Sequence, residues 1–144
     1  MIVVDTSIWL DLFREGDLER IRLAEKFFEE IERLTIYEPQ VFRIELAGVL
    51  ARYYPRDEVE RFVNNILNKI SLCKDLEEKA YKVALSTGSR AIDAYFIACA
   101  SSINSILVSN DKIQVNNARK YGIEAYYLLK EYNAVLNRIK DLIK

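Results

Sequence analysis

Five short apolar runs alternate with longer segments in which apolar residues recur every three or four positions. Continuous apolar runs are typical of strands that are buried on both faces, and the longer pattern is typical of amphipathic helices. Strands that alternate with helices favour an α/β fold built around a parallel sheet. The predicted strands are Ile2–Val4, Leu34–Tyr37, Ile70–Cys73, Ser105–Ser109 and Ala125–Leu129.

The segments between these runs carry the start and stop signals of helices. Asp17 can cap a long amphipathic helix, and Ser89 can cap a strongly apolar one. Pro39 is predicted to open a helix, and Pro55 forces a break before the next helix. The predicted helices cover 6–14, 18–31, 39–53, 56–67, 76–85, 89–103 and 113–121, and a final helix follows the last strand.

The length and composition favour one folded domain. A chain of 144 residues matches the usual size of a domain, and no linker or internal repeat is evident, so we predict a single domain over 1–144. With 51% hydrophobic and 30% charged residues, the composition excludes intrinsic disorder. Neither a targeting segment nor an apolar run of about 18 residues occurs, which predicts a cytoplasmic protein without a membrane span.

The chain contains no histidine. This absence excludes Ser-His-Asp and Cys-His mechanisms, a His-ligated zinc and a histidine general base. The two cysteines, Cys73 and Cys99, lie far apart in the sequence without close-spaced partners, so neither a disulfide framework nor a zinc knuckle is expected. Both are predicted to be small core residues. Any chemistry must therefore come from carboxylates or hydroxyls.

Two acidic residues lie just past the ends of predicted strands. Asp5 comes after the first strand, and Asp111 comes after the fourth. Each could simply cap the helix that follows it, since aspartate is favoured in turns and at helix N-termini. Ligands of parallel sheets, however, bind beyond the carboxyl ends of the strands. Both interpretations stay open for each residue when it is considered alone.

Two further acids lie on apolar faces of predicted helices. Glu45 shares its face with Val41 and Val49, and Asp93 shares its face with Phe96. A buried carboxylate is costly unless it finds a cation or hydrogen-bond donors. Arg52 could pair with Glu45, and the helix dipole could favour Asp93 by about 0.3–1 kcal/mol. A role as a metal ligand is the alternative for both acids.

These four acids are expected to meet at the carboxyl edge of the sheet. Carboxylates that converge there repel one another unless a cation lies between them. Oxygen ligands without histidine or cysteine select a hard ion such as Mg²⁺ or Mn²⁺. Such a cluster commonly serves phosphoryl transfer. The net charge of −1 lacks the basic excess of many nucleic-acid-binding proteins, but a metal can supply positive charge.

Four motifs resemble the PIN domain and, within it, the ribonuclease toxins of VapBC toxin–antitoxin pairs. They are VVDTSIWLDLF (3–13), ELAGVL (45–50), DAYFIACA (93–100) and ILVSND (106–111), and they follow one another in the family order. The resemblance implies a three-layer α/β/α sandwich with a five-stranded parallel sheet. It also implies Mg²⁺- or Mn²⁺-dependent cleavage of single-stranded RNA, a homodimer and a small VapB-like antitoxin.

The resemblance also implies roles for single residues. Asp5, Asp93 and Asp111 match the metal-binding aspartates, and Glu45 matches the carboxylate of the helix, so these four are the predicted catalytic residues. Hydroxyl positions of the family are matched by Thr6 and Ser109. A further acid that often follows the last aspartate is missing, because Ile113 and Gln114 occupy this segment. One metal ion and two metal ions are therefore alternatives.

Two arginines and a group of aromatic residues lie close to these motifs. Arg43 and Arg90 are near site carboxylates and could contact substrate phosphates, although exposed arginines are common on surfaces. Apolar residues of the first two helices could either pack in the core or line a groove for an antitoxin helix. These residues are Trp9, Leu12, Phe13, Phe27 and Phe28.

Other functions compete with an RNA-cleaving toxin. The first alternative is a catalytically weak PIN-like scaffold that binds RNA or protein. Another is a hydrolase with an aspartyl nucleophile, but such enzymes usually carry a second aspartate where this chain has Ser7. Dinucleotide binding is not expected, because no glycine-rich fingerprint follows any predicted strand.

Overall fold

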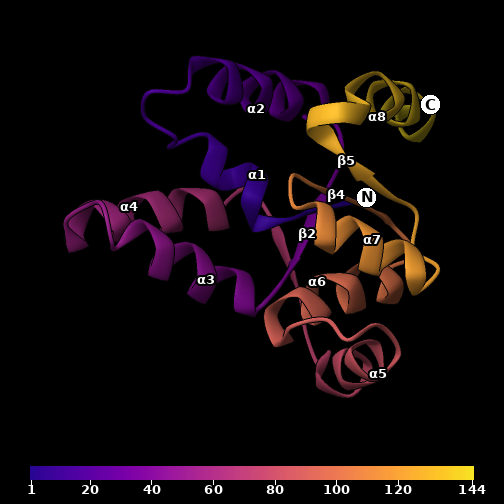
Figure 1. Ribbon diagram of the computed structural model, residues 1–144. Helices are drawn as coiled ribbons and strands as arrows, with labels where there is room; N and C mark the ends of the chain where they lie inside the picture. The colour runs from indigo at the N-terminus through magenta and orange to yellow at the C-terminus, as the bar shows by residue number, and fades with distance from the viewer.

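The computed structural model describes residues 1–144 and contains one five-stranded sheet with helices on both of its faces (Figure 1). All neighbouring strands are parallel, in the order β3-β2-β1-β4-β5. This arrangement confirms the predicted α/β fold. The strands are β1 (Ile2–Val4), β2 (Ile36–Pro39), β3 (Ser71–Cys73), β4 (Ile106–Ser109) and β5 (Ala125–Tyr127).

Eight helices surround the sheet. In Figure 1, α5, α6 and α7 lie on one side of the strands, α2 and α8 lie on the other, and the α3–α4 pair projects outward. None of the helices is long and apolar enough to cross a membrane. The helices are α1 (Thr6–Asp11), α2 (Leu18–Glu30), α3 (Val41–Leu50), α4 (Arg56–Leu67), α5 (Glu77–Thr87), α6 (Ala91–Ser102), α7 (Lys112–Lys120) and α8 (Leu128–Ile143).

Several predicted boundaries are confirmed. The bounds of α4 agree with the prediction, and Asp17 caps α2 by accepting a hydrogen bond from the Arg20 N–H at 3.1 Å. Gly88 ends α5 with a φ of +73°, a conformation that glycine adopts without steric cost. By contrast, α1 ends at Asp11, three residues before the predicted end.

Two predicted helix starts are wrong. Pro39 is the last residue of β2 and pairs with Cys73 of β3, so α3 begins only at Val41. Ser89 does not cap α6: its hydroxyl and that of Thr87 form a hydrogen bond of 2.6 Å, and Arg90 occupies the N-cap position without a side-chain bond. The Ser89 hydroxyl therefore bonds to the neighbouring Thr87 hydroxyl instead of accepting a hydrogen bond from the N-terminus of α6.

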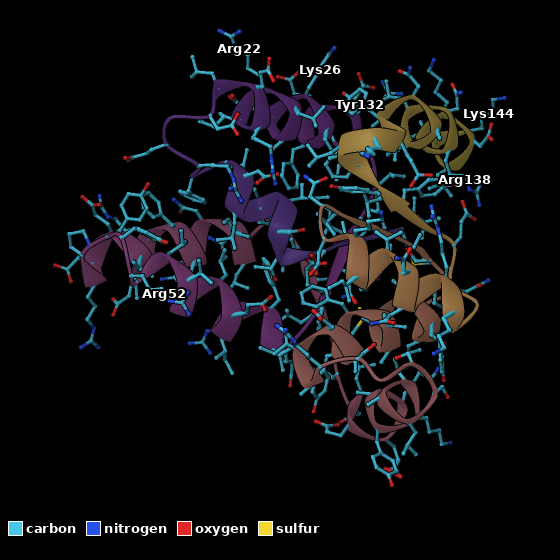
Figure 2. All side chains as sticks on the ribbon, in the orientation of Figure 1. Arg22, Lys26, Arg52, Tyr132, Arg138 and Lys144 are labelled. Atoms are coloured by element: carbon cyan, nitrogen blue, oxygen red, sulfur yellow. The ribbon has the colours of Figure 1, made fainter.

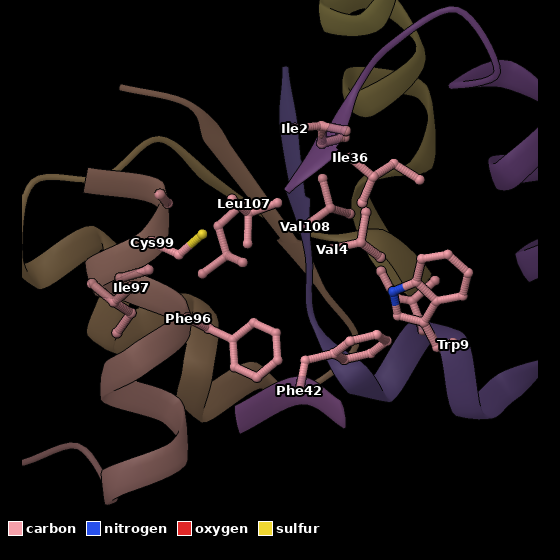
Figure 3. Packing of buried hydrophobic residues seen from close by; sticks show 14 of the residues in the cluster. Ile2, Val4, Trp9, Ile36, Phe42, Phe96, Ile97, Cys99, Leu107 and Val108 are labelled. Carbon is pink, nitrogen blue, oxygen red and sulfur yellow. The ribbon is translucent and has the colours of Figure 1, made fainter. Parts of the chain in front are cut away.

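A row of three aromatic side chains connects the helices that surround the end of β1. The ring centroids of Trp9 and Phe42 are 5.8 Å apart, and those of Phe42 and Phe96 are 6.4 Å apart (Figure 3). All three side chains are buried. Such pairs contribute about 0.5–1.5 kcal/mol beyond their buried area. The row therefore fixes α1, α3 and α6 relative to one another, next to the carboxyl edge of the sheet.

The opposite side of the sheet has a looser connection between α2 and α8. The Lys26 ammonium on α2 lies 5.8 Å from the centroid of the Tyr132 ring on α8 (Figure 2). An exposed cation–π contact of this kind contributes about 0.5–1 kcal/mol. The central strand β1 lies between the two helix layers and is fully covered, since Ile2, Val3 and Val4 are all buried.

Candidate active site

Asp5 directly follows β1 and lies buried at the carboxyl edge of the sheet. Its Oδ2 accepts hydrogen bonds from the Ser7 hydroxyl at 2.7 Å, the Ser109 hydroxyl at 2.9 Å and the Ser7 N–H at 3.4 Å. Asp5 is thus the N-cap of α1, which confirms the capping role that the sequence allowed for it. Burial raises the pKa of the Asp5 carboxyl, and the serine hydrogen bonds oppose this rise.

Asp111 is the second residue after β4 and approaches the same edge of the sheet. Its Oδ1 accepts hydrogen bonds from the Ile113 N–H at 2.9 Å and the Gln114 N–H at 3.4 Å, so it caps α7. The Asp111 N–H donates to the Ser109 hydroxyl at 2.9 Å, and that hydroxyl donates to Asp5. Ser109 therefore connects the two aspartates, while Oδ2 of Asp111 accepts no hydrogen bond.

Glu45 approaches the same edge from α3 and is half-buried. Burial raises the pKa of its carboxyl, and the negative charges of Asp5 and Asp111 raise it further. The neighbouring Thr6 hydroxyl opposes part of this rise, although it has no hydrogen-bond partner at normal length. Arg52 does not pair with Glu45; it lies exposed at the outer end of α3 (Figure 2).

Asp93 lies in the first turn of α6 and is also half-buried. Burial raises the pKa of Asp93 to about 6, and the charges of Asp5, Asp111 and Glu45 contribute to the rise. Arg90, one helical turn away, partly opposes it. The structure therefore brings all four predicted acids close enough to repel one another.

No cation of the chain neutralises this group of four acids, which we call the carboxylate cluster. None of its members takes part in an ion pair. Arg90 acts on Asp93 only as an exposed neighbouring charge, and Arg43 is exposed on α3. Neither arginine makes a hydrogen bond to the cluster. Repulsion among the four acids is therefore left uncompensated within the chain.

The donor set fits a hard divalent cation. All four side chains offer only oxygen ligands, which Mg²⁺ and Mn²⁺ prefer. No three of them already converge in a geometry that would hold an ion. Beside Asp93, the buried Gln114 side chain donates to the Asp93 carbonyl at 3.2 Å, and its own Oε1 has no partner. The site thus contains unsatisfied oxygen atoms in addition to its repelling carboxylates.

The sequence interpretation did not identify Glu38, which is fully buried on β2. Its Oε2 accepts a hydrogen bond from the Trp9 indole N–H at 2.7 Å, and its Oε1 accepts one from the Val4 N–H at 3.1 Å. Burial raises the pKa of Glu38 well above its usual range, and these two bonds oppose the rise. The signal available was an acid directly after the predicted strand Leu34–Tyr37. Through these two bonds, Glu38 joins α1 to Val4, the last residue of β1, which directly precedes Asp5.

Asp11 was also overlooked. It is 1% exposed, forms ion pairs of 3.0 Å with Arg14 and Arg20, and accepts a hydrogen bond from the Asn110 amide at 2.8 Å. The Asn110 Oδ1 accepts the Leu129 N–H at 3.0 Å, so this network ties α1 to the end of β4 and the start of α8. The sequence feature that could have indicated Asp11 is its spacing of three residues from Arg14. The same spacing also occurs at ordinary surface sites.

The apolar residues of α1 and α2 pack mainly into the core. Trp9 and Phe27 are buried, whereas Leu12, Phe13 and Phe28 are partly buried against the core. The two cysteines differ as well: Cys99 is buried as predicted, but Cys73 is only half-buried. The expectation of two core cysteines is therefore wrong for Cys73, because β3 is an edge strand.

Comparisons with known proteins agree with the fold described above. No curated protein sequence matched the chain. Among solved structures, FitAcB from Neisseria gonorrhoeae is similar at 14% identity and a TM-score of 0.65, covering 88% of this chain and 96% of its own. The structure of FitAB bound to an IR36 DNA fragment is similar at 14% identity and a TM-score of 0.68. The alignment covers 88% of this chain and 94% of that one.

PAE2754 from Pyrobaculum aerophilum is similar at 19% identity and a TM-score of 0.60, and the alignment covers 97% of this chain and 96% of that one. At such low identities these likenesses support the fold. The sequence itself matches the family model of the PIN domain over residues 2–120, a span that includes all four acids of the carboxylate cluster. The chain therefore belongs to the PIN domain family.

Proposed function

We propose that this protein is a metal-dependent endoribonuclease that cleaves single-stranded RNA. PIN domains are typically metal-dependent nucleases. The observation that carries the proposal is the carboxylate cluster: Asp5, Glu45, Asp93 and Asp111 repel one another at the carboxyl edge of the sheet, and no ion pair relieves them. The negative charge of these four acids is not balanced by cations of the chain, and a bound cation and substrate would balance it.

Asp5, Asp93 and Asp111 would hold Mg²⁺ or Mn²⁺. Two hydrogen-bonded serines orient the Asp5 carboxylate, and the capping bonds at Oδ1 orient Asp111 so that Oδ2 stays available. When bound, the ion would supply an activated water and positive charge at the leaving oxygen. Asp5 and Asp111 follow the paired strands β1 and β4, and Asp93 lies in α6, so strand pairing and the packing of α6 determine their separation.

Glu45 would orient the attacking water and accept its proton. Its raised pKa makes the carboxylate a better proton acceptor near neutral pH than an ordinary exposed glutamate. The exposed arginines Arg43 and Arg90 would contact phosphates of the RNA on either side of the cleaved bond.

The chemistry at the cut ends tests this proposal. Hydrolysis by an activated water leaves a 5′-phosphate and a 3′-hydroxyl, whereas attack by the 2′-hydroxyl of the RNA leaves a cyclic phosphate and needs no metal. We expect the hydrolytic ends from a labelled single-stranded oligonucleotide, and no cleavage in EDTA. Cyclic phosphate ends, or cleavage that survives EDTA, would contradict the proposal.

Variants separate catalysis from binding. Glu45→Gln keeps the side-chain size but removes the charge, so it should lower the cleavage rate at least about 100-fold while RNA affinity changes little. Glu25→Gln, an exposed acid of α2, is the matched control and should cleave normally. RNA binding by the wild type without any cleavage in Mg²⁺ or Mn²⁺ would instead support a catalytically weak scaffold.

We further propose that a small antitoxin inhibits the nuclease, as the VapBC resemblance implies. A cavity of about 520 Å³ opens between α1 and the end of α3, and six of its eight lining residues are hydrophobic. Such a groove can accept the apolar face of a partner helix. The lining residues are Leu10, Phe13, Arg14, Glu15, Val49, Leu50, Tyr53 and Tyr54.

A surface substitution tests this groove. Tyr53 is 75% exposed and lines it, whereas Tyr81 on α5 is 60% exposed and does not. With the small protein encoded by the neighbouring reading frame as probe, Tyr53→Asp should weaken inhibition of RNA cleavage, and Tyr81→Asp should not. Equal effects of both variants would contradict the groove. Light scattering of the free protein would test the implied homodimer.

A further inference from the structure

The two cysteine sulfurs lie against each other. Sγ of Cys73 and Sγ of Cys99 are 2.6 Å apart, and both thiols are free. Non-bonded heavy atoms pack at about 3.5–4.0 Å, whereas a disulfide bond measures about 2.05 Å. The two sulfurs are therefore within reach of a covalent bond with little movement of either side chain.

The two cysteines belong to elements that differ in access to solvent. Cys73 is the last residue of β3, the edge strand of the sheet, and is half-buried. Cys99 lies in α6 and is fully buried, with its sulfur directed toward the sheet (Figure 3). A small reagent can thus reach Cys73 from solvent, but Cys99 can react only through Cys73.

The proposed nuclease chemistry uses neither thiol. Cys99 is on the same helix as Asp93 but points into the core, and Cys73 stands across from Pro39 rather than from any member of the carboxylate cluster. Burial raises the pKa of both thiols, and the charge of Glu38 adds to this rise. This raised pKa predicts slow oxidation that becomes faster at alkaline pH.

We propose that Cys73 and Cys99 form a reversible disulfide that links β3 to α6. With a small-molecule disulfide as oxidant, the Cys73 thiolate attacks one sulfur of the oxidant and releases its other half as a thiolate. Cys99 then loses its proton, attacks the Cys73 sulfur and releases the second thiolate. Two electrons and two protons leave the cysteines, and the oxidant becomes two thiols.

The bond would close a loop that contains α5 and would fasten the edge of the sheet. β3 has three residues and pairs only with β2, so few backbone hydrogen bonds hold it. A disulfide across a loop of this size restricts the unfolded chain. We expect the oxidised protein to melt roughly 5–10 °C above the reduced protein.

Oxidised glutathione is the probe, and the intact full-length protein is the sample. After incubation we expect a monomer whose mass is lower by two hydrogens and whose two thiols no longer react with an alkylating reagent. Dithiothreitol should restore both thiols. A persistent glutathione adduct on the wild type, a disulfide-linked dimer, or two thiols that stay free would each overturn the proposal.

Two variants locate the reaction. In Cys99→Ala, Cys73 has no partner and should keep one glutathione, whereas in Cys73→Ser the buried Cys99 should stay unmodified. Because Cys73 is half-buried, Cys73→Ser also provides a folded control if the core substitution unfolds the protein. RNA cleavage is measured in parallel, and a failure of the nuclease proposal would leave the mass result unchanged.

Discussion

Asp11 and the carboxylate cluster both contact the turn after β4, but only Asp11 is neutralised by cations of the chain. Asp11 is surrounded by donors from within the chain: two arginines and the amide of Asn110. The carboxylate cluster, which includes Asp111, contacts hydroxyls and backbone N–H groups but forms no ion pair. Asn110 donates to Asp11, whereas the next residue, Asp111, belongs to the carboxylate cluster.

The proposed function explains this difference as one between structural acids and ligand-binding acids. An acid that only connects helices gains stability when the chain supplies its counter-charge, as it does for Asp11. An acid that must bind an external cation or substrate has to stay available, and the free protein bears the repulsion. The two groups should therefore respond in opposite directions when a charge is removed.

The largest effect is expected from Asp11→Ala. This change leaves Arg20 and the Asn110 amide without their acceptor, and breaking a buried charged network in this way costs about 3 kcal/mol. Urea unfolding should show this loss in the free energy of unfolding. Arg56→Ala, which removes an exposed pair with Glu60, is the control and should cost less than about 0.5 kcal/mol. Equal losses in the free energy of unfolding of both variants would contradict the distinction between Asp11 and an ordinary exposed ion pair.

The next effect in size is stabilisation by a divalent cation. At ten times its dissociation constant, Mn²⁺ or Mg²⁺ bound only to the folded state should stabilise it by about 1.4 kcal/mol. Thermal unfolding should detect the shift at constant ionic strength. Asp5→Asn should reduce it, whereas Asp11→Asn should retain it. An equal shift produced by NaCl would indicate general screening rather than a site.

Asp93→Asn should stabilise the metal-free protein above neutral pH. The folded pKa of Asp93 is about 6, above the ordinary 3.8, so between these values the folded state binds a proton that the unfolded state has released. Wild-type stability therefore falls as pH rises through this window. Because the side chain is half-exposed, we expect a gain of about 1 kcal/mol in the variant near pH 8.

That gain should be mostly lost near pH 3.5, where the wild-type carboxyl is protonated in the folded state and mostly protonated in the unfolded state. Unfolding curves at both pH values, recorded in EDTA, provide the measurement. A loss of stability at the higher pH would mean that Asp93 is needed for its hydrogen bonds or for helix capping. The carboxylate cluster would then resemble Asp11 rather than differ from it.

Local sequence patterns predicted most of the fold. Strands buried on both faces leave continuous apolar runs, and Arg56–Leu67 shows a clear helical period after Pro55, so these elements could be recognised. Pro39 could not be placed, because proline fits both the end of a strand and the first turn of a helix. Only the pairing with Cys73 resolves this ambiguity.

The candidate site could be assembled from the sequence because parallel topology gathers strand ends at one edge. This reasoning located Asp5 and Asp111, and unfavourable helix positions identified Glu45 and Asp93. Glu38 escaped because its partners, Trp9 and the Val4 N–H, are tertiary contacts that no local spacing encodes. The contact between Cys73 and Cys99 escaped for the same reason.

The smallest expected effect concerns Arg90, the exposed cation that partly relieves Asp93. Arg90→Gln should raise the pKa of Asp93 by a few tenths of a unit, because the attraction acts through solvent. Carboxyl NMR titration of the metal-free protein measures the shift, and Arg43→Gln is the exposed control. About 1 M salt, where the screening length is about 3 Å, should abolish the difference between wild type and variant. A shift that persists in high salt would mean that Arg90 pairs directly with Asp93, and the carboxylate cluster would then contain an internal counter-charge as the Asp11 group does.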